Sequence, residues 1–374
     1  MINIKLRQLR LARGYSLDEM VAKIGGIVTK QAISKYERGV SMPSPRVLNK
    51  LAEGLGVKAS RLMGESPVNI EFLAYRKKSR LAKKEQLRIE NFVRFSLEER
   101  IRLQEMTFQD ISSDIPIRKY DVSCLEDAEC AAEELRKVWK LGIDPISNTV
   151  NLLEDNNVHV FEINAHNCFD GISAVASTKR NRVVAAAVVT QSGLSGERQR
   201  LNLTHELGHL VLAVKKDIDE EKAAFRFGGA FLVSRELLMR EIGPRRSSIS
   251  LDELLLFKER FGISLQALLY RLKDLEIING RHYMMWCKYI NKKGWKKVEP
   301  NPIVSEKPEW LRRVILRALT EQIITHEDAE EMLGEKIEQR ENLPLVQIRS
   351  FMELPLKERK RLMRERAKKM ASYY

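Results

Sequence analysis

Two histidines four positions apart, His205 and His209, constrain this chain more than any other feature. Residues i and i+4 lie on one face of an α-helix, so the two imidazoles can bind a single metal ion together. Glu206 follows the first histidine and would project beside that ion, where its carboxylate can hold a water molecule. Such a triplet arises by chance in on the order of one chain in a hundred of this length, so its surroundings decide its meaning.

The surroundings favour a metal site over two ordinary buried histidines. Six apolar residues flank the motif and would keep the site dry: Leu201, Leu203, Leu207, Leu210, Val211 and Leu212. Two histidines with a glutamate between them on an apolar face have no simple packing explanation. The pattern therefore predicts the zinc-binding and catalytic helix of a metallopeptidase.

A catalytic zinc site needs a third protein ligand and one position left open for water. The acidic residues that follow the motif are Asp217, Asp219, Glu220 and Glu221. Glu221 precedes Ala224 by three residues and shares the apolar face of the next predicted helix, so it is our first choice, with Glu220 second. The predicted metal ligands are His205, His209 and Glu221.

Zinc is the expected cofactor, and manganese is also compatible with two histidines and a glutamate. The ion would lower the pKa of its bound water to about 7 and polarise the scissile carbonyl. Glu206 would take the proton of that water and later deliver it to the leaving amine. A donor to the oxyanion is also expected, and the candidates are Tyr270, Arg271 and His282.

The first 57 residues are predicted to form a compact helical unit. Glycines and prolines separate four amphipathic segments, and Ser16 with Glu19 has the spacing of a capping box. The third helix is predicted over residues 29–38, with Ala32, Ile33 and Tyr36 facing inward.

Residues 4–57 resemble the Xre and lambda-repressor-like helix-turn-helix family, with matches in residues 4–10, 16–22, 29–39 and 45–57. The resemblance implies that the third helix enters the major groove of double-stranded DNA. Gln31 can pair with adenine through two hydrogen bonds, and Lys30 or Lys35 can reach guanine or phosphate. The predicted DNA contacts are Thr29, Lys30, Gln31, Ser34 and Lys35. The alternative is a small helical domain used for protein contact or dimerisation.

Residues 197–209 resemble the core of the ImmA/IrrE family of metallopeptidases, and residues 221–234 resemble the block that follows it there. The family's metal-binding glutamate falls on Glu221, whereas Phe225 stands in place of the usual asparagine and Ser234 in place of the usual proline. Residues 139–146, 169–171 and 261–272 also look like that family. The resemblance covers about residues 115–290.

The charge of the chain is uneven. The net charge is +14, and residues 1–66 hold 12 Lys or Arg against 5 Asp or Glu. Residues 351–374 hold 8 against 3. A basic surplus at both ends suggests a polyanionic partner such as nucleic acid, and a solvated basic surface is the alternative.

Two charged segments lie outside the resemblances. Residues 68–112 are predicted to form one or two long helices, an arm with a basic core at residues 75–84; a solvated linker helix is the alternative. The tail, residues 350–374, looks like a segment common in small bacterial antitoxins. The alternative is a basic amphipathic helix that packs on the domain or docks a partner.

The predicted fold is multidomain and mainly α. Residues 1–66 form the all-α helix-turn-helix domain, 67–114 the helical arm, 115–290 an α+β zincin-like domain with a small sheet, and 291–374 a helical region with the basic tail. In the third part we expect a helix over 125–141, strands over 158–163 and 183–189, a turn at 169–171, and helices over most of 220–290.

Two functions follow as hypotheses. The first is a DNA-binding transcriptional regulator with zinc-dependent endopeptidase activity, which hydrolyses a repressor or an antitoxin, in the setting of stress response or a toxin–antitoxin system. The second is a non-proteolytic regulator or antitoxin that uses the peptidase fold as a sensor. We expect a homodimer, operator DNA and a toxin as partners. With no membrane span, no secretory signal and no CxxC pair among 4 cysteines, we expect a cytoplasmic, nucleoid-associated bacterial protein.

Overall fold

The computed structural model describes residues 2–64, 66, 68–74, 81–108, 115–165, 169, 171–337 and 358. It divides into two compact units, residues 1–323 and 324–374. The predicted tail at 350–374 lies outside the described residues except for Glu358, as do residues 75–80 of the predicted basic core. No described helix is long and apolar enough to cross a membrane.

The N-terminal residues form the helical unit that the sequence predicts. Its helices are α1 (Ile2–Ala12), α2 (Leu17–Lys23), α3 (Lys30–Glu37), α4 (Pro45–Leu55) and α5 (Ala59–Met63). Ser16 and Glu19 form the predicted capping box of α2, and Gly56 ends α4 in the left-handed conformation that glycine adopts at little cost. Leu9, Ile33 and other fully buried apolar residues of α1 to α5 make one core.

The segment that follows differs from the predicted arm. β1 (Val68–Ala74) is a strand, and only then does α6 (Lys83–Thr107) begin. Val68 and Ile70 are buried, whereas the residues after each of them are exposed, which is the period of two expected of a strand. The prediction of helix over residues 68–74 was wrong because the high charge of the wider segment hid this short alternation.

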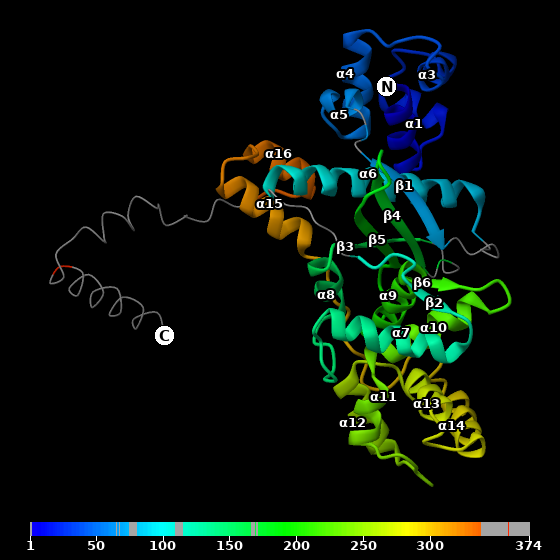
Figure 1. The fold of residues 1–374 in the computed structure, drawn as a ribbon. Coiled ribbons are helices and arrows are strands. Elements are labelled where there is room, and N and C mark those ends of the chain that lie inside the picture. Colours follow the sequence, from blue (N-terminus) through cyan, green and yellow to red (C-terminus); the bar gives the residue numbers. More distant parts are fainter. Residues whose placement is uncertain are drawn as a thin grey trace. The chain divides into compact units, whose positions relative to one another are not determined.

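α6 packs between the helical unit and the sheet (Figure 1). Apolar side chains recur every four residues along it, and each is at most 1% exposed: Ile89, Val93, Leu97 and Ile101. They join the apolar face of the sheet in one cluster, while Phe95 packs against the core of α1 to α5. A solvated linker helix is therefore excluded for residues 83–107.

A mixed sheet forms the centre of the larger unit. Its other strands are β3 (Val158–Ile163), β4 (Gly171–Thr178) and β5 (Val183–Gln191). In the described chain the order is β1-β4-β5-β3, with β4 antiparallel to both neighbours and β3 parallel to β5. β3 and β5 lie where the sequence predicts strands, but β4 extends past the predicted turn and was missed.

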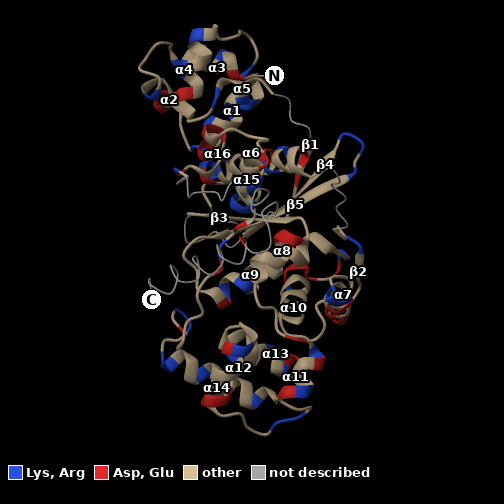
Figure 2. Ribbon diagram, turned by 90° about the vertical axis from the view of Figure 1, so that its left-hand side faces the viewer, with Lys and Arg blue, Asp and Glu red and all other residues tan. Residues whose placement is uncertain are grey.

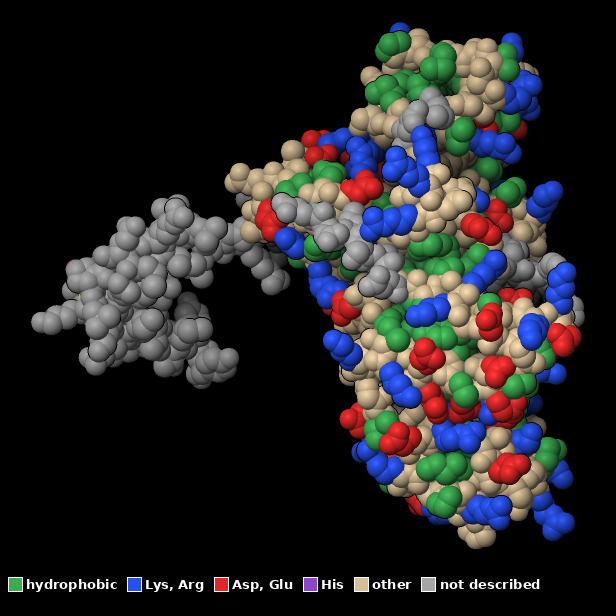
Figure 3. Space-filling model, in the orientation of Figure 1, with side chains coloured by type: hydrophobic (Ala, Val, Ile, Leu, Met, Phe, Trp, Pro, Cys, Tyr) green, Lys and Arg blue, Asp and Glu red, His purple; other side chains and the backbone are tan. Residues whose placement is uncertain are grey.

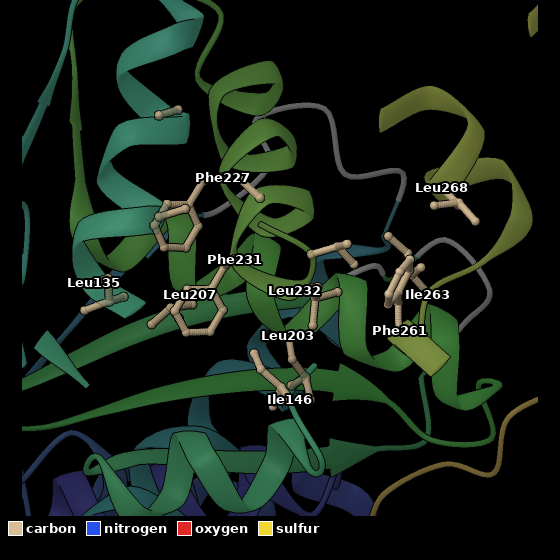
Figure 4. Packing of buried hydrophobic residues seen from close by; sticks show 14 of the residues in the cluster. Leu135, Ile146, Leu203, Leu207, Phe227, Phe231, Leu232, Phe261, Ile263 and Leu268 are labelled. Atoms are coloured by element: carbon tan, nitrogen blue, oxygen red, sulfur yellow. The ribbon is translucent and has the colours of Figure 1, made fainter. Parts of the chain in front are cut away.

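The second face of the sheet packs against helices. α9 (Gly196–Val211) contributes Leu203 and Leu207, and α10 (Glu220–Leu232) contributes Phe227 and Phe231 to the same core (Figure 4). The elements around them are α7 (Leu125–Val138), α8 (Thr149–Asp155), and the short parallel pair β2 (Tyr120–Val122) and β6 (Leu212–Val214). The sheet is thus covered by α6 on one face and by α9 on the other.

The remaining helices of this unit follow α10. They are α11 (Arg235–Glu241), α12 (Leu251–Phe261), α13 (Leu265–Asp274), α14 (Gly280–Lys292) and α15 (Trp310–Thr320). Basic and acidic residues are interspersed along α11 to α14 (Figure 2), as on an ordinary solvated surface. In the second unit, α16 (His326–Leu333) begins at a capping box made by Thr325 and Asp328.

Residues 299–309, which connect α14 to α15 and are here called the strap, contact the beginning of α9. Lys258 is fully buried, and its Nζ is 3.1 Å from Oε1 of Glu197 and 3.5 Å from Oε2 of Glu299. The backbone nitrogen of Ile303 donates to Oε2 of Glu197 over 3.0 Å. A buried ammonium needs such partners, so the packing around α9 continues past residue 290.

Candidate functional site

The two histidines lie on α9, which crosses α10 at close range. Glycines allow this approach. A Cβ built on Gly208 would lie 3.2 Å from a backbone atom of α10, and one built on Gly228 would lie 3.0 Å from a backbone atom of α9. Larger residues at these positions would push the helices apart and move the first turn of α10 away from the histidine rings.

Three side chains converge at this crossing: His205, His209 and Glu221. The Nε2 atoms of the histidines are 3.1 Å apart. The carboxylate of Glu221 places Oε2 3.4 Å from Nε2 of His205 and Oε1 3.7 Å from Nε2 of His209. One ligand atom from each residue lies within 4.8 Å of the others. Because metal–nitrogen and metal–oxygen bonds are about 2.0–2.2 Å long, these side chains can share one ion.

The burial of the group is one-sided. His205 and His209 are 3% and 7% exposed, whereas the side chain of Glu221 is 41% exposed. Imidazole nitrogens with one carboxylate suit zinc and similar divalent ions. The group therefore fits such an ion, with apolar packing behind the histidines and access from the side of Glu221.

Burial also affects the protonation of His209. Burial lowers the pKa of His209 below its usual range, and the neighbouring His205 lowers it further. The carboxylates of Glu221 and Glu220 oppose the shift. A lowered pKa keeps the imidazole neutral near neutral pH, and the neutral form is the one that binds a metal ion.

Glu206 lies against the first residue of β4. A Cβ built on Gly171 would be 2.4 Å from Oε1 of Glu206 and 2.8 Å from its Cδ. A side chain at this position would require the carboxylate of Glu206 or the start of β4 to shift. Gly171 belongs to the predicted turn at residues 169–171, whose middle residue lies outside the described chain. The turn that contains this glycine was predicted, whereas its contact with the predicted catalytic base was not.

Phe225 contacts the site directly. Its ring centroid lies 4.1 Å from that of His205, and the residue is 43% exposed. Phe225 stands where the resembling family has asparagine. The structure places its ring beside a predicted ligand, at the accessible side of the group.

The other acidic candidates take different positions. Oε1 of Glu220 faces Nδ1 of His209 at 3.4 Å, on the ring nitrogen that Glu221 does not approach. Asp219 caps α10 by accepting a hydrogen bond from the backbone nitrogen of Lys222, and Asp217 is exposed. The geometry therefore favours Glu221 over Glu220 as a third ligand.

The oxyanion candidates do not join this group. Arg271 is buried, and its guanidinium donates to both carboxylate oxygens of Glu129 and to the carbonyl of Val233. His282 accepts a hydrogen bond from Trp286 within α14. Tyr270 is exposed on α13. The donors of Arg271 thus bond to groups that hold α7, α10 and α13 together and do not point to the metal group.

The predicted DNA-contact residues gather on α3. Thr29 caps the helix by accepting from the backbone nitrogen of Ala32 at 3.3 Å. Lys30, Gln31 and Lys35 are exposed, as is Thr29, and Ser34 is half-buried. The inward face contains the fully buried Ile33, with Ala32 and Tyr36 half-buried beside it.

An ion pair joins α3 to α1. Arg10 of α1 donates to both carboxylate oxygens of Glu37, at 2.5 and 2.7 Å, and so ties α3 to the core.

Exposed apolar residues also occur on this unit, among them Val40 and Met42, and hydrophobic atoms are visible on its surface in Figure 3.

Comparison with known families assigns two parts of the chain. Residues 6–62 match the model of the Helix-turn-helix family, and residues 172–273 match that of the IrrE N-terminal-like domain. The two matches confirm the predicted fusion of an Xre-like DNA-binding domain with an IrrE-like peptidase domain. No curated protein and no solved structure matches the chain.

Proposed function

We propose that this chain, which joins a helix-turn-helix domain to an IrrE-like peptidase domain, is a DNA-binding regulator that hydrolyses a regulatory protein. The observation that carries the proposal is that Glu221 of α10 converges with His205 and His209 of α9, the helix that also bears Glu206. Zinc is the proposed ion, and the substrate class is a repressor or antitoxin that acts at the same DNA.

The residues of the site divide the reaction between them. His205, His209 and Glu221 would hold the ion, which when bound supplies a Lewis acid for water and for the scissile carbonyl. Glu206 accepts a proton from the attacking water on its carboxylate, while the water oxygen bonds to the carbonyl carbon. The same carboxylate then gives that proton to the nitrogen of the leaving amine as the C–N bond breaks. Gly171 leaves room for the carboxylate to act in both steps.

The test compares wild type with Glu206→Gln. Each is co-expressed with the products of neighbouring genes, and the cell extracts are searched for a fragment that is present with wild type alone. We expect Glu206→Gln to keep its metal, measured by elemental analysis of the purified protein, and to lose the cleavage. Glu236→Gln, an exposed glutamate on α11, is the matched control and should cleave normally.

A non-proteolytic regulator predicts a different result. Wild type and Glu206→Gln would then give the same fragments, and variants of the site would repress the operator normally. That outcome would favour the peptidase fold as a sensor or as an antitoxin module. The predicted homodimer, toxin partner and nucleoid association remain proposals.

A further inference from the structure

β1 adds an outer strand to the sheet beside the proposed metal site. It lies between the helix-turn-helix unit and α6 in the sequence, outside residues 172–273, which match the peptidase family. β1 pairs antiparallel with β4, from Val68 opposite Thr178 to Ala74 opposite Ser173. Among the described strands, β1 therefore covers the side of β4 that would otherwise be the edge of the sheet.

The covered edge leads to the predicted catalytic base. β4 begins at Gly171, which touches Glu206, and the pairing with β1 ends at Ser173, only two residues away. A strand edge offers unpaired backbone groups that bind an extended peptide by strand addition. A substrate added along β4 would therefore pass directly toward Glu206, and β1 occupies that position.

The side chains of β1 pack along the edge of β4 as those of a bound peptide would. Val68 and Ile70 are buried in the cluster that α6 forms with the sheet, and Phe72 packs against it. The pairing shifts between Phe72 and Ala74, and Leu73 at this irregularity packs against the core that contains α9. β1 thus places apolar side chains on both faces of the sheet, as an extended apolar peptide would.

The contacts that fix the start of β1 also include a residue of the helix-turn-helix unit. Oγ of Ser66 lies 2.9 Å from Oε1 of Glu98, on α6, and 2.7 Å from the carbonyl oxygen of Val68, so its one proton can be donated to either acceptor. The other oxygen of Glu98 pairs with Lys5 of α1, and both side chains of that pair are 10% exposed. One carboxylate on α6 therefore holds the start of β1 and the first helix of the DNA-binding unit.

We propose that β1 is a built-in competitor for the substrate: it occupies the β4 edge in the resting chain and must leave before an extended apolar protein segment can pair there and reach Glu206. This inference deepens the proposed function and rests on it for the role of Glu206. The ion pair between Lys5 and Glu98 connects the release of β1 to the position of the DNA-binding unit.

The test locks β1 in place with a reversible disulfide. Asn69 and Ser177 are paired across β1 and β4, so Asn69→Cys with Ser177→Cys brings two thiols together. The full-length chain is used with the exposed Cys124 and Cys130 changed to serine. The matched control, Ser177→Cys with Val183→Cys, joins β4 to β5 and leaves β1 free.

The probe is a fluorescein-labelled peptide with the sequence of residues 66–74, and fluorescence anisotropy measures its binding. We expect binding to the reduced lock and to the control in both redox states, with at least a tenfold loss when the lock is oxidised. Addition of dithiothreitol should restore binding. Equal binding by the oxidised and reduced lock, or no binding in any state, would overturn the proposal.

Binding is also measured with Glu206→Gln added to each protein. The peptide needs no catalysis to bind, so a chain that fails to hydrolyse any protein still reports whether β1 leaves β4. Absence of cleavage with normal, lock-sensitive peptide binding would count against the proposed function alone. Loss of lock sensitivity with normal cleavage would count against the competitor alone.

Discussion

Oε1 of Glu220 lies 3.4 Å from Nδ1 of His209, whose Nε2 faces His205 on the other side of the ring. A carboxylate at Nδ1 fixes the tautomer and orientation of a metal-binding imidazole. We therefore expect Glu220→Gln to weaken zinc binding by about 10-fold. Glu221→Gln removes a predicted ligand and should weaken it much further.

A competition titration against a chromophoric zinc chelator measures both affinities in the purified chain. The two glutamates are adjacent and differ in the ring atoms that they approach, so each variant controls for the charge lost in the other. A larger loss in Glu220→Gln than in Glu221→Gln would reverse the assignment of the third ligand.

Gly171→Ala should separate metal binding from catalysis. The added Cβ would lie 2.4 Å from Oε1 of Glu206, so the carboxylate or the start of β4 must move. Displacement of a catalytic group by about 1 Å can cost on the order of 100-fold in rate. We expect a loss of that size in the cleavage rate with unchanged zinc content. Gly280→Ala, where the Cβ meets open space, is the control and should cleave normally.

Two residues of α3 should contribute differently to DNA binding. The operator is first selected from random duplexes with wild-type protein. Gln31→Ala should then cost about 1–3 kcal/mol at one base pair and relax the preference there. Lys35→Ala should weaken all sequences alike and reduce the slope of log affinity against log salt by about 1.

Anisotropy titrations at several salt concentrations measure both effects. Lys50→Ala, an exposed lysine of α4 that pairs with Glu53, is the control for lost charge on the same unit. A uniform effect of Gln31→Ala across sequences would contradict a base contact by that residue.

His159 should make the fold sensitive to acid. Its ring is fully buried against Trp310, with no hydrogen-bond partner for either nitrogen in the described chain. Burial, with the nearby Arg100, holds the pKa of His159 well below 6.5. Below pH 6.5 the unfolded chain therefore gains a proton at His159 that the folded chain does not. The free energy of unfolding falls by about 1.4 kcal/mol for each unit by which the pH drops below that value.

His159→Phe keeps a ring beside Trp310 and removes the proton. The free energy of unfolding, from urea titrations at pH 7 and pH 5, should therefore fall by ~2 kcal/mol less in the variant than in wild type. Equal losses in the two proteins would show that other groups carry the acid sensitivity.

The positions of the predicted ligands followed from local rules. The helical spacing of His205 and His209 places both rings on one face, and the apolar face shared by Glu221 and Ala224 turns that glutamate toward α9. The contact between Gly171 and Glu206 could not be predicted in this way, because it depends on how β4 lies against α9. The pairing of Arg271 with Glu129 likewise joins α13 to α7, and no local pattern indicates it.

The errors in the fold have a common cause. β1 contains an alternation of only five residues within a strongly charged segment, and β4 is rich in small residues without a clear period. Whether such short runs become strands depends on a neighbour with free backbone groups, which the sequence does not reveal. α6 was predicted as helix from its composition, but its role between two cores depends on apolar residues four apart that were not given weight.

The strap also supplies partners to α9 and α12 that are synthesised after both helices. Buried Lys258 and Arg200 receive carboxylate partners from the strap, at Glu299 and Glu306, and these residues leave the ribosome after α9 and its histidines. N-terminal domains generally fold first during translation. The nascent chain can therefore complete the helices of its helix-turn-helix unit well before the first turns of α9 have all their partners, so the folding of the DNA-binding unit does not wait for the completion of α9.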